Sequence, residues 1–506
     1  MLVVTGEEMQ ILEQETLKML GFSSLILMEN AGSRIVEFIK NKFGVLKDKK
    51  IHILVGPGNN GGDGLVVARQ LLTHDAKPKV YLLGKTSQLT EENKTNLEYA
   101  KKLNIDLVQV DYGQISKLRF SLSMADIIID CMLGTGFSGQ LSAELSSVVQ
   151  VIKKIAVPII AVDVPTGVDA ASGQVLGDAI RADFTINLGA YKLGCLLYPG
   201  RDYAGENVVV DLGLPLNEKG KPERYLLNED ILGHLPPRVP WGHKGTFGSL
   251  FVISGSRHYA GAALLCGQAA LRSGAGTVTL AVPQGIYDRF APSELILAPL
   301  PETELGSFSK DGYQQIHDLM HDKDILIIGP GLSNEEETLK LVQKLLKDWE
   351  KPVVIDASAL EALTDEFLEN IPKSRLKKWI LTPHPGEMAR LIDSSATEIN
   401  NNRIESAVKF AEQWGLILVL KGAPTIITNG KRTYINSTGS HGMATAGTGD
   451  VLAGLIGGLL GQGAEPLYAA TMGVYAHGAA SDLLGKQKQR TLIAGDCLSK
   501  LSEILS

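Results

Sequence analysis

The chain carries a carboxylate at the end of a glycine-rich stretch in its C-terminal part. Asp450 follows Gly447-Thr448-Gly449, and a run of apolar residues and glycines occupies residues 451–460. Such a run predicts a buried helix whose free N–H groups point back at the loop, where they attract phosphate. We interpret Asp450 as a base that deprotonates a substrate hydroxyl while the loop amides hold a phosphoryl group in transfer. A helix-capping role is the alternative.

The second half of the chain contains several short strand signals that must position this loop. They are rich in Ile, Val and Leu and alternate with helical patterns, which predicts a mostly parallel sheet flanked by helices. Polar groups and glycines follow these strands and should face the Asp450 loop. The predicted strands cover residues 249–253, 325–328, 353–355, 379–381 and 416–420.

Two side chains that follow these strands could assist phosphoryl transfer, and a third, His384, could in principle bind a metal. Lys421 could pair with a nucleotide phosphate, with a solvated strand-end lysine as the alternative. Glu387 is interpreted as a carboxylate that acts on Mg²⁺ through water, because magnesium keeps much of its hydration near phosphates. His384 has no second His or Cys at zinc-ligand spacing, which argues against zinc.

The first half begins with a helical pattern and then contains a strand, a glycine-rich loop and a helix. The pattern covers residues 7–42, the strand residues 51–55 and the loop residues 56–64, and the next helical pattern starts at Leu65. This order places N–H groups and a helix dipole where parallel sheets bind dinucleotides or phosphates. Two asparagines and an aspartate in the loop distinguish it from the G-x-G-x-x-G fingerprint. Their oxygens could contact polar ligand groups or a cation.

Two later strands of the first half also end in polar residues. One runs into Asp130, and the next runs into Asp163 and then Thr166. If these strands are parallel neighbours, the three side chains gather with Asn60 along one edge of the sheet. A single Asp at a strand end is more often a turn residue, but the convergence of several polar strand ends favours a site.

Residues 1–215 resemble the NAD(P)H-hydrate epimerase domain, through motifs at residues 28–32, 59–64, 130–136 and 163–167. That family has a Rossmann-like fold and interconverts the two C6 epimers of hydrated NADH and NADPH. The resemblance implies a set of dinucleotide-binding residues. They are Asn59, Asn60, Gly61, Gly62, Asp63, Gly134, Thr135, Gly136, Phe137, Ser138, Gly139, Gln140 and Asp163.

The same resemblance implies a potassium site and a catalytic group. Asn60, Asp130 and Thr166 would surround K⁺, a hard cation suited to oxygen ligands, and Thr166 stands where the family often has serine. Asp130 is also the candidate acid or base. Lys192 is a weaker candidate, and its alternative is a solvated surface lysine.

The second half, from about residue 225 to 506, resembles the ribokinase-like ADP-dependent NAD(P)H-hydrate dehydratase. The shared motifs include Gly329-Pro330-Gly331, residues 382–387 and residues 421–425, together with Gly447-Thr448-Gly449-Asp450. Ala446 replaces a glycine common in the family. The resemblance assigns Ala262, Gly331, His384 and Asp450 to the hydrated dinucleotide. It assigns to ADP the loop of residues 441–449 and, within the motifs, Lys421, Gly422, Ala423, Pro424, Thr425, Gly447, Thr448 and Gly449.

Together the two resemblances imply a bifunctional enzyme that repairs hydrated nicotinamide cofactors, NADHX and NADPHX. The first half would epimerise the R and S forms. The second would dehydrate the S form with ADP converted to AMP and phosphate. A rival hypothesis is a small-molecule kinase of the ribokinase type fused to a nucleotide-binding module without catalysis.

Length and composition agree with a two-domain α/β enzyme. The 506 residues exceed one ordinary core, and the polar stretch near residue 220 predicts domains at 1–220, Rossmann-like and three-layered, and 221–506, ribokinase-like. The net charge of −7 argues against nucleic acid or anionic lipid as a partner. Four scattered cysteines predict reduced, mostly buried thiols. We expect a cytoplasmic homo-oligomer, because the N-terminus lacks a signal-peptide pattern and no segment predicts a membrane span.

Overall fold

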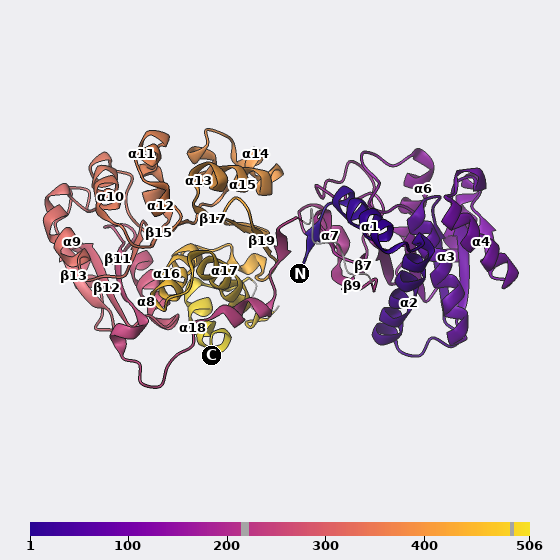
Figure 1. The fold of residues 1–506 in the computed structure, drawn as a ribbon, viewed down its shortest axis with the longest axis horizontal. Coiled ribbons are helices and arrows are strands. Elements are labelled where there is room, and N and C mark those ends of the chain that lie inside the picture. Colours follow the sequence, from indigo (N-terminus) through magenta and orange to yellow (C-terminus); the bar gives the residue numbers. More distant parts are fainter. Residues whose placement is uncertain (214–221, 486–489) are drawn as a thin grey trace. The chain divides into compact units, whose positions relative to one another are not determined.

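The computed structural model describes residues 1–213, 222–485 and 490–506. The chain forms two compact units, Met1–Arg224 and Tyr225–Ser506, each described here by itself (Figure 1). The boundary expected between residues 220 and 221 lies outside the described residues. All four cysteines are buried and free, as predicted. Across the described ranges, no helix has the length and apolar character to cross a membrane.

The first unit is built on a parallel seven-stranded sheet. Val3–Val4 (β1) pairs with Tyr191–Lys192 (β8) outside it. In spatial order the sheet contains β4 (Asp106–Gln109), β3 (Lys77–Leu82), β2 (Lys50–Val55), β5 (Ile127–Cys131), β6 (Ile159–Val162), β7 (Phe184–Leu188) and β9 (Glu206–Val210).

Helices cover both faces of this sheet, because the side chains of each strand alternate between two cores. Ile127 and Ile129 pack in one core, while Ile128 packs in the other. The first core includes residues of α1 (Gly6–Leu20), α2 (Ser24–Phe43), α3 (Asn59–Leu71) and α4 (Glu91–Lys102), and the second those of α5 (Ile115–Leu122) and α6 (Ala143–Ile152). A short helix, α7 (Gly200–Ala204), precedes β9. This is a three-layer α/β unit.

Two expectations about local structure need correction. The helical pattern over residues 7–42 forms two helices, because Gly21 at φ 68° ends α1 in the left-handed conformation. The glycine-rich stretch predicted as a loop up to residue 64 is helical from Asn59. Its glycines serve close packing, since a Cβ on Gly62 would lie 2.9 Å from Met28 Sδ and one on Gly64 would lie 2.9 Å from Cys131 Cβ.

The second unit contains a ten-stranded mixed sheet. β18 pairs antiparallel with both β17 and β19. All pairs along the series β17, β16, β15, β14, β11, β12 and β13 are parallel. The predicted strands of this half are all present, which confirms a mostly parallel sheet. In spatial order it contains β10 (Arg224–Leu226), β19 (Thr433–Asn436), β18 (Thr425–Thr428), β17 (Ile417–Leu420), β16 (Trp379–Leu381), β15 (Val353–Ile355), β14 (Ile325–Ile328), β11 (Ser249–Ile253), β12 (Thr277–Pro283) and β13 (Ile296–Leu300).

The predicted apolar helix behind Asp450 is α16 (Thr448–Gly461), and it lies in the core of this unit. It packs against α8 (Ala260–Arg272), α17 (Pro466–Asp482) and the inner strands (Figure 1). The last helix of the same core is α18 (Ala494–Ile504). The remaining helices are α9 (Tyr313–Met320), α10 (Glu336–Asp348), α11 (Asp365–Glu369), α12 (Lys373–Leu376), α13 (Pro385–Leu391), α14 (Ala396–Asn401) and α15 (Arg403–Trp414).

Candidate active sites

The strand order of the first unit places a crevice at the carboxyl ends of β2 and β5. From β2 the chain continues outward to β3 and β4, then returns to β5 on the other side of β2. Helices that leave such neighbours on opposite faces open a binding crevice between them. Asn60, in the first turn of α3, lies at this point. Its Nδ2 donates to the carbonyl oxygens of Leu133, at 2.8 Å, and Val162, at 3.2 Å, while its buried Oδ1 has no hydrogen-bond partner among the described residues.

Asp130 and Thr166 meet beside Asn60, as the strand-end argument predicted. Thr166 donates to the Asp130 carboxylate through its backbone N–H, at 2.8 Å, and its hydroxyl, at 2.7 Å. A third bond comes from the Met132 N–H at 3.2 Å. Burial raises the pKa of Asp130 to about 6, against the lowering effect of these hydrogen bonds. Asp130 is therefore a fixed, fully buried carboxyl group.

Asp163, whose backbone adopts φ 70°, has partners other than that trio. Its carboxylate accepts a hydrogen bond from the Leu188 N–H and forms an ion pair with Lys192. Lys192 is 0% exposed and also donates to the Leu188 carbonyl at 2.6 Å. The alternative of a solvated surface lysine is therefore wrong. A buried lysine keeps its charge only with such partners, and the sequence showed no sign of them.

The other dinucleotide candidates of the first unit divide into two groups. Asn59 and Asp63 line a cavity of about 460 Å³ beside the start of α3. The segment after β5 is more exposed, and its Gly134 is the residue that approaches Asn60, since a Cβ there would lie 3.1 Å from Asn60 Cβ. Gly136, Ser138, Gly139 and Gln140 are exposed, whereas Thr135 and Phe137 are partly buried.

The second unit presents Asp450 in the first turn of α16, as predicted. Gly447, at φ 91°, is the left-handed residue before that helix. Thr448 anchors the loop, because its hydroxyl donates to the carbonyls of Met443 and Thr445, both at 3.1 Å. The Asp450 carboxylate accepts no hydrogen bond from any described residue. The loop therefore holds the backbone at a helix N-terminus while the carboxylate stays free.

Three further side chains form a charged cluster near Asp450. Lys421 Nζ lies 2.7 Å from Asp356 Oδ1 and 3.8 Å from Glu387 Oε2. Gly449 lies next to the ion pair of Lys421 and Asp356, since a Cβ on Gly449 would lie 3.4 Å from Lys421 Nζ and 3.9 Å from Asp356 Oδ2. Lys421 is thus no solvated strand-end lysine. Burial and the negative charges of Asp356 and Glu387 raise the pKa of Asp450 to about 7, although Lys421 acts in the opposite direction.

Asp356 and Arg403 belong to this site but were not predicted from the sequence. Asp356 is 1% exposed and accepts a hydrogen bond from the Thr382 hydroxyl at 2.7 Å. Its position directly after β15 was a signal of the same kind as that of Asp130. Arg403 donates to the carbonyl oxygens of Lys421 and Pro424, at 2.8 and 3.2 Å, and so supports the loop of residues 421–425. No sequence pattern marks it.

His384 serves as the N-cap of α13. Its Nδ1 accepts hydrogen bonds from the N–H groups of Gly386, at 3.0 Å, and Glu387, at 3.2 Å. Glu387 returns a bond through Oε2 to the His384 N–H at 2.7 Å. Ala262 and Gly331 come together in the same unit, since a Cβ on Gly331 would lie 2.8 Å from the Ala262 methyl group. The other substrate candidates are thus placed on α8, on α13 and after β14.

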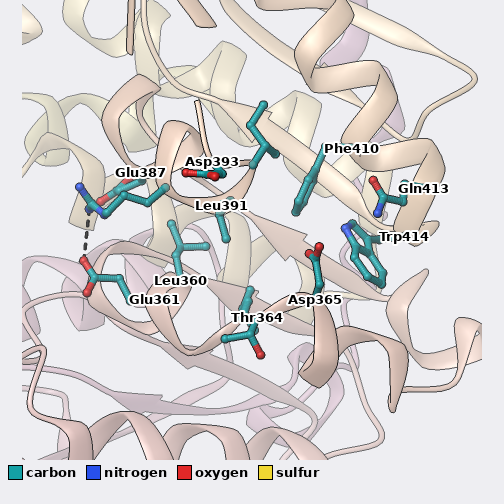
Figure 2. A pocket seen from close by; sticks show the side chains of 13 residues that line it. Leu360, Glu361, Thr364, Asp365, Glu387, Leu391, Asp393, Phe410, Gln413 and Trp414 are labelled. Atoms are coloured by element: carbon teal, nitrogen blue, oxygen red, sulfur yellow. Dashed lines mark ion pairs between the residues drawn. The ribbon is translucent and has the colours of Figure 1, made fainter. Parts of the chain in front are cut away.

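A separate cavity of about 630 Å³ lies beside Glu387 (Figure 2). Its walls come from α11, α13 and α15 and include Phe410 and Trp414. The Arg390–Glu361 ion pair, at 3.3 Å, stands on one side. Glu387 is its only lining residue among the site residues selected from the sequence, so this cavity adjoins the charged cluster without containing Asp450.

The fold and the two helix starts define a class of protein. One unit is a Rossmann-like α/β domain, and the other is a ribokinase-like domain with a carboxylate at the N-terminus of its central helix. Residues 24–194 match the family described as YjeF-related protein N-terminus, and residues 250–503 match the family NAD(P)H-hydrate dehydratase. This is a bifunctional α/β enzyme.

Relatives of known name match the chain over its whole length. It is 40% identical to the bifunctional NAD(P)H-hydrate repair enzyme of Moorella thermoacetica, over 100% of this chain and 97% of that protein. It is 34% identical to the enzyme of that name from Escherichia coli strain K12, over 98% of this chain and 92% of that one. A crystal structure of the ADP/ATP-dependent NAD(P)H-hydrate dehydratase from Bacillus subtilis, with ATP and Mg²⁺, is 32% identical over 55% of this chain and 97% of that chain, with a TM-score of 0.49.

The chain therefore belongs to the bifunctional NAD(P)H-hydrate repair enzymes, with an epimerase domain followed by an ADP-dependent dehydratase domain. The resemblances found in the sequence are confirmed. The rival hypothesis of a small-molecule kinase fused to a non-catalytic module is not supported.

Proposed function

We propose that the second unit removes the C6 hydroxyl of the hydrated dinucleotide after converting it into a phosphate ester. Asp450 takes the proton of that hydroxyl, and the oxygen attacks the β-phosphorus of ADP, which releases AMP. The N–H groups at the start of α16 and the Lys421 ammonium group bind the transferred phosphoryl group. One observation carries this proposal. The Asp450 carboxyl group, which accepts no hydrogen bond from a described residue and has a pKa of about 7, lies at the helix N-terminus beside Lys421.

The phosphate ester makes the second half of the reaction possible. Hydroxide is a poor leaving group, whereas phosphate departs readily. The lone pair of the ring nitrogen expels phosphate from C6, and the loss of a proton from C5 then restores the ring double bond. The products are the reduced coenzyme, AMP and free phosphate. A site built like that of a kinase thus performs an overall elimination.

ADP and the dinucleotide would occupy neighbouring parts of this site. For ADP we propose the loop that ends at Gly449 and the segment of residues 421–425, to whose carbonyl oxygens Arg403 donates hydrogen bonds. For the dinucleotide we propose Ala262, Gly331 and His384. Gly449 lies next to Lys421, which supports a phosphate position shared by the two substrates.

The donor atoms of the two units fit two different cations. In the first unit the unpaired Asn60 Oδ1, the single carboxylate of Asp130 and the oxygen atoms of Thr166 suit K⁺, which would fix the crevice beside the dinucleotide. In the second unit Glu387 is engaged by the His384 N–H, so it would hold Mg²⁺ through water, and this ion would neutralise phosphate charge. The described residues contain no group of three or more His, Cys, Asp or Glu side chains arranged for a metal ion.

For the first unit we propose Asp130 as an acid or base of the epimerisation. Its pKa of about 6 keeps both protonation states accessible near neutral pH. The dinucleotide would lie along the starts of α3 and of the segment after β5 and would contact Asp163, which Lys192 holds in an ion pair.

The assembly and its surroundings are part of the same proposal. The expected domains, 1–220 and 221–506, would each carry one activity. Reduced cysteines support a cytoplasmic location, and the net charge of −7 supports small molecules rather than nucleic acid or anionic membranes as partners. Sedimentation analysis would test the expected homo-oligomer.

An oxygen-18 label in the C6 hydroxyl tests the dehydration route. The substrate is incubated with ADP and the enzyme, and the products are analysed by mass spectrometry. Phosphoryl transfer to the hydroxyl requires that the label leave in inorganic phosphate. Label in water instead would mean that the C–O bond breaks without a phosphate ester, and the proposal would be wrong.

A further inference from the structure

The cavity beside the start of α3 contains a carboxyl group that the resemblance does not assign. Glu13, on α1, lines this cavity of about 460 Å³ together with Asn59 and Asp63 of α3. It also lies before residues 24–194, the region that the family match covers. The tertiary structure therefore adds to the proposed dinucleotide site a residue that none of the four motifs contains.

Both cavity carboxyl groups lack a hydrogen-bond donor among the residues that the structure describes. Asp63 is 7% exposed, so it is an almost fully buried acid that faces open space. A third lining carboxylate, Glu92, differs because the Ser24 hydroxyl donates to it at 2.6 Å. Structural carboxylates in protein interiors normally have such donors. Their absence at Glu13 and Asp63 points to a ligand as the missing partner.

Burial keeps both the protonated and the ionised form of Glu13 accessible near neutral pH. Burial raises its pKa to about 7; Lys192 acts to lower that pKa, and Asp163 acts to raise it. The pKa of Asp63 is also raised well above its ordinary value, by burial and then by the charges of Asp163 and Glu13. Glu92, from α4, is the other ionisable group of the cavity wall.

Inversion of a hydroxyl-bearing carbon next to a ring nitrogen needs two proton-transfer groups. An acid protonates the departing hydroxyl, the C6–O bond breaks, and the nitrogen lone pair stabilises the cation. Water then adds to the opposite face and gives up a proton to a base. One water leaves and one enters, so no other reactant is consumed. Asp130, which accepts hydrogen bonds from Thr166 and Met132, can supply only one of these two groups.

We propose that Glu13 is a catalytic residue of the epimerase unit, which protonates the C6 hydroxyl as it leaves. In the reverse direction its carboxylate takes the proton of the incoming water. Asp63 lines the same cavity. This inference rests on the epimerase activity and on the placement of the nicotinamide ring in this cavity.

The test is Glu13→Gln in the full-length chain, with exchange between the R and S hydrates followed by chromatography from about pH 6 to 9. Glutamine has the shape of the protonated acid but no proton to transfer. We expect kcat to fall by about 10²-fold or more while KM changes by less than about threefold. The wild-type kcat should fall above about pH 7, as Glu13 ionises, and the variant should lose that dependence.

Two further variants make the result specific. Glu13→Asp keeps an acid at the position. Its kcat should be at least about tenfold higher than that of Glu13→Gln, and it should again fall at high pH. Glu15→Gln, at an exposed position of the same helix, should match the wild type. Thermal melting of each variant checks the fold.

The outcomes separate the inference from the function on which it rests. A Glu13→Gln variant with kcat within about threefold of the wild type, or with an unchanged pH dependence, would refute the role of Glu13 and leave the epimerase activity intact. A wild-type chain that does not exchange the epimers at all would instead refute the function of the unit.

Discussion

At the scale of single residues, each unit presents a carboxyl group whose burial is not balanced by hydrogen bonds. Glu13 in the first unit and Asp450 in the second both have a pKa raised to about 7, with burial as the largest cause. A buried carboxylate without donors is costly, and sites retain such groups where proton transfer is the task. Asp130 also has a raised pKa, of about 6, but it differs in accepting three hydrogen bonds.

We expect Asp450→Asn to abolish dehydration while ADP affinity stays within a few-fold, because the backbone N–H groups of the loop remain. In the wild type, the base must be ionised, so kcat should rise with pH up to about pH 7 and level off above it. Stopped-assay pH profiles and calorimetric ADP titration measure both quantities. Loss of ADP binding equal to the loss of rate would show that the residue is structural.

The same substitution should change the pH dependence of stability. The folded pKa lies above the unfolded value of 3.8, so ionisation of Asp450 destabilises the fold as pH rises from about 4 to 7. Asp450→Asn removes this cost. Because the side chain is partly exposed, we expect a gain of about 2 kcal/mol at pH 8 and none near pH 4. Denaturant unfolding at the two pH values measures it, and an equal effect at both would contradict the assignment.

At the scale of elements, glycines determine how closely the helices that carry the sites approach their neighbours. A Cβ on Gly454 of α16 would lie 2.1 Å from the Cys266 carbonyl oxygen of α8, and one on Gly457 would lie 2.3 Å from Ile327 Cδ1 of β14. α16 therefore packs closely between α8 and the sheet. Its N-terminal turn, which carries Asp450, is placed by these contacts as well as by the loop.

We expect Gly454→Ala to destabilise the second unit by about 1–3 kcal/mol, because the new methyl group forces α16 away from backbone atoms of α8. Dehydratase activity should fall with it, since Asp450 moves with the helix. Chemical unfolding and kcat measure the two effects. Gly495→Ala, in α18 with open space around the position, is the matched control and should not reduce stability. Equal effects of the two substitutions would exclude the packing explanation.

At the scale of the whole molecule, each unit has its own hydrophobic core. The described clusters of the first unit end at Leu212, and that of the second begins at Leu227, so none mixes residues of both. Each unit also has a complete sheet, of seven and ten strands. Separate cores of this size normally support independent folding.

We therefore expect residues 1–213 and 222–506, produced as separate chains, to fold and to divide the activities. The first should exchange the epimers and the second should dehydrate the S form, each with kcat within about threefold of the intact chain. The second fragment retains β10, which pairs with β19 at the edge of its sheet. Circular dichroism and the two assays test this. A fragment that folds but is inactive would show that its site needs the other unit.

The sequence by itself determined the parts of this protein that depend on local order. Alternating strand and helix patterns, with glycines at the helix starts, predicted two α/β units, placed Asn60, Asp130 and Thr166 at one edge of a sheet and placed Asp450 at the start of a helix. These predictions succeeded because parallel strands bring their ends to one edge whatever the intervening segments contain. The family resemblance rested on the same motifs.

Only the tertiary structure decided which side chains meet across distant elements. Lys192 is buried against Asp163, Asp356 holds Lys421, and Glu13 reaches the cavity of α3 from the first helix of the chain. Residues 59–64 are helical, and their glycines let α3 pack closely against Met28 and Cys131. Burial, close approach and ion pairing depend on packing between segments far apart in sequence, and local patterns carry no information about them.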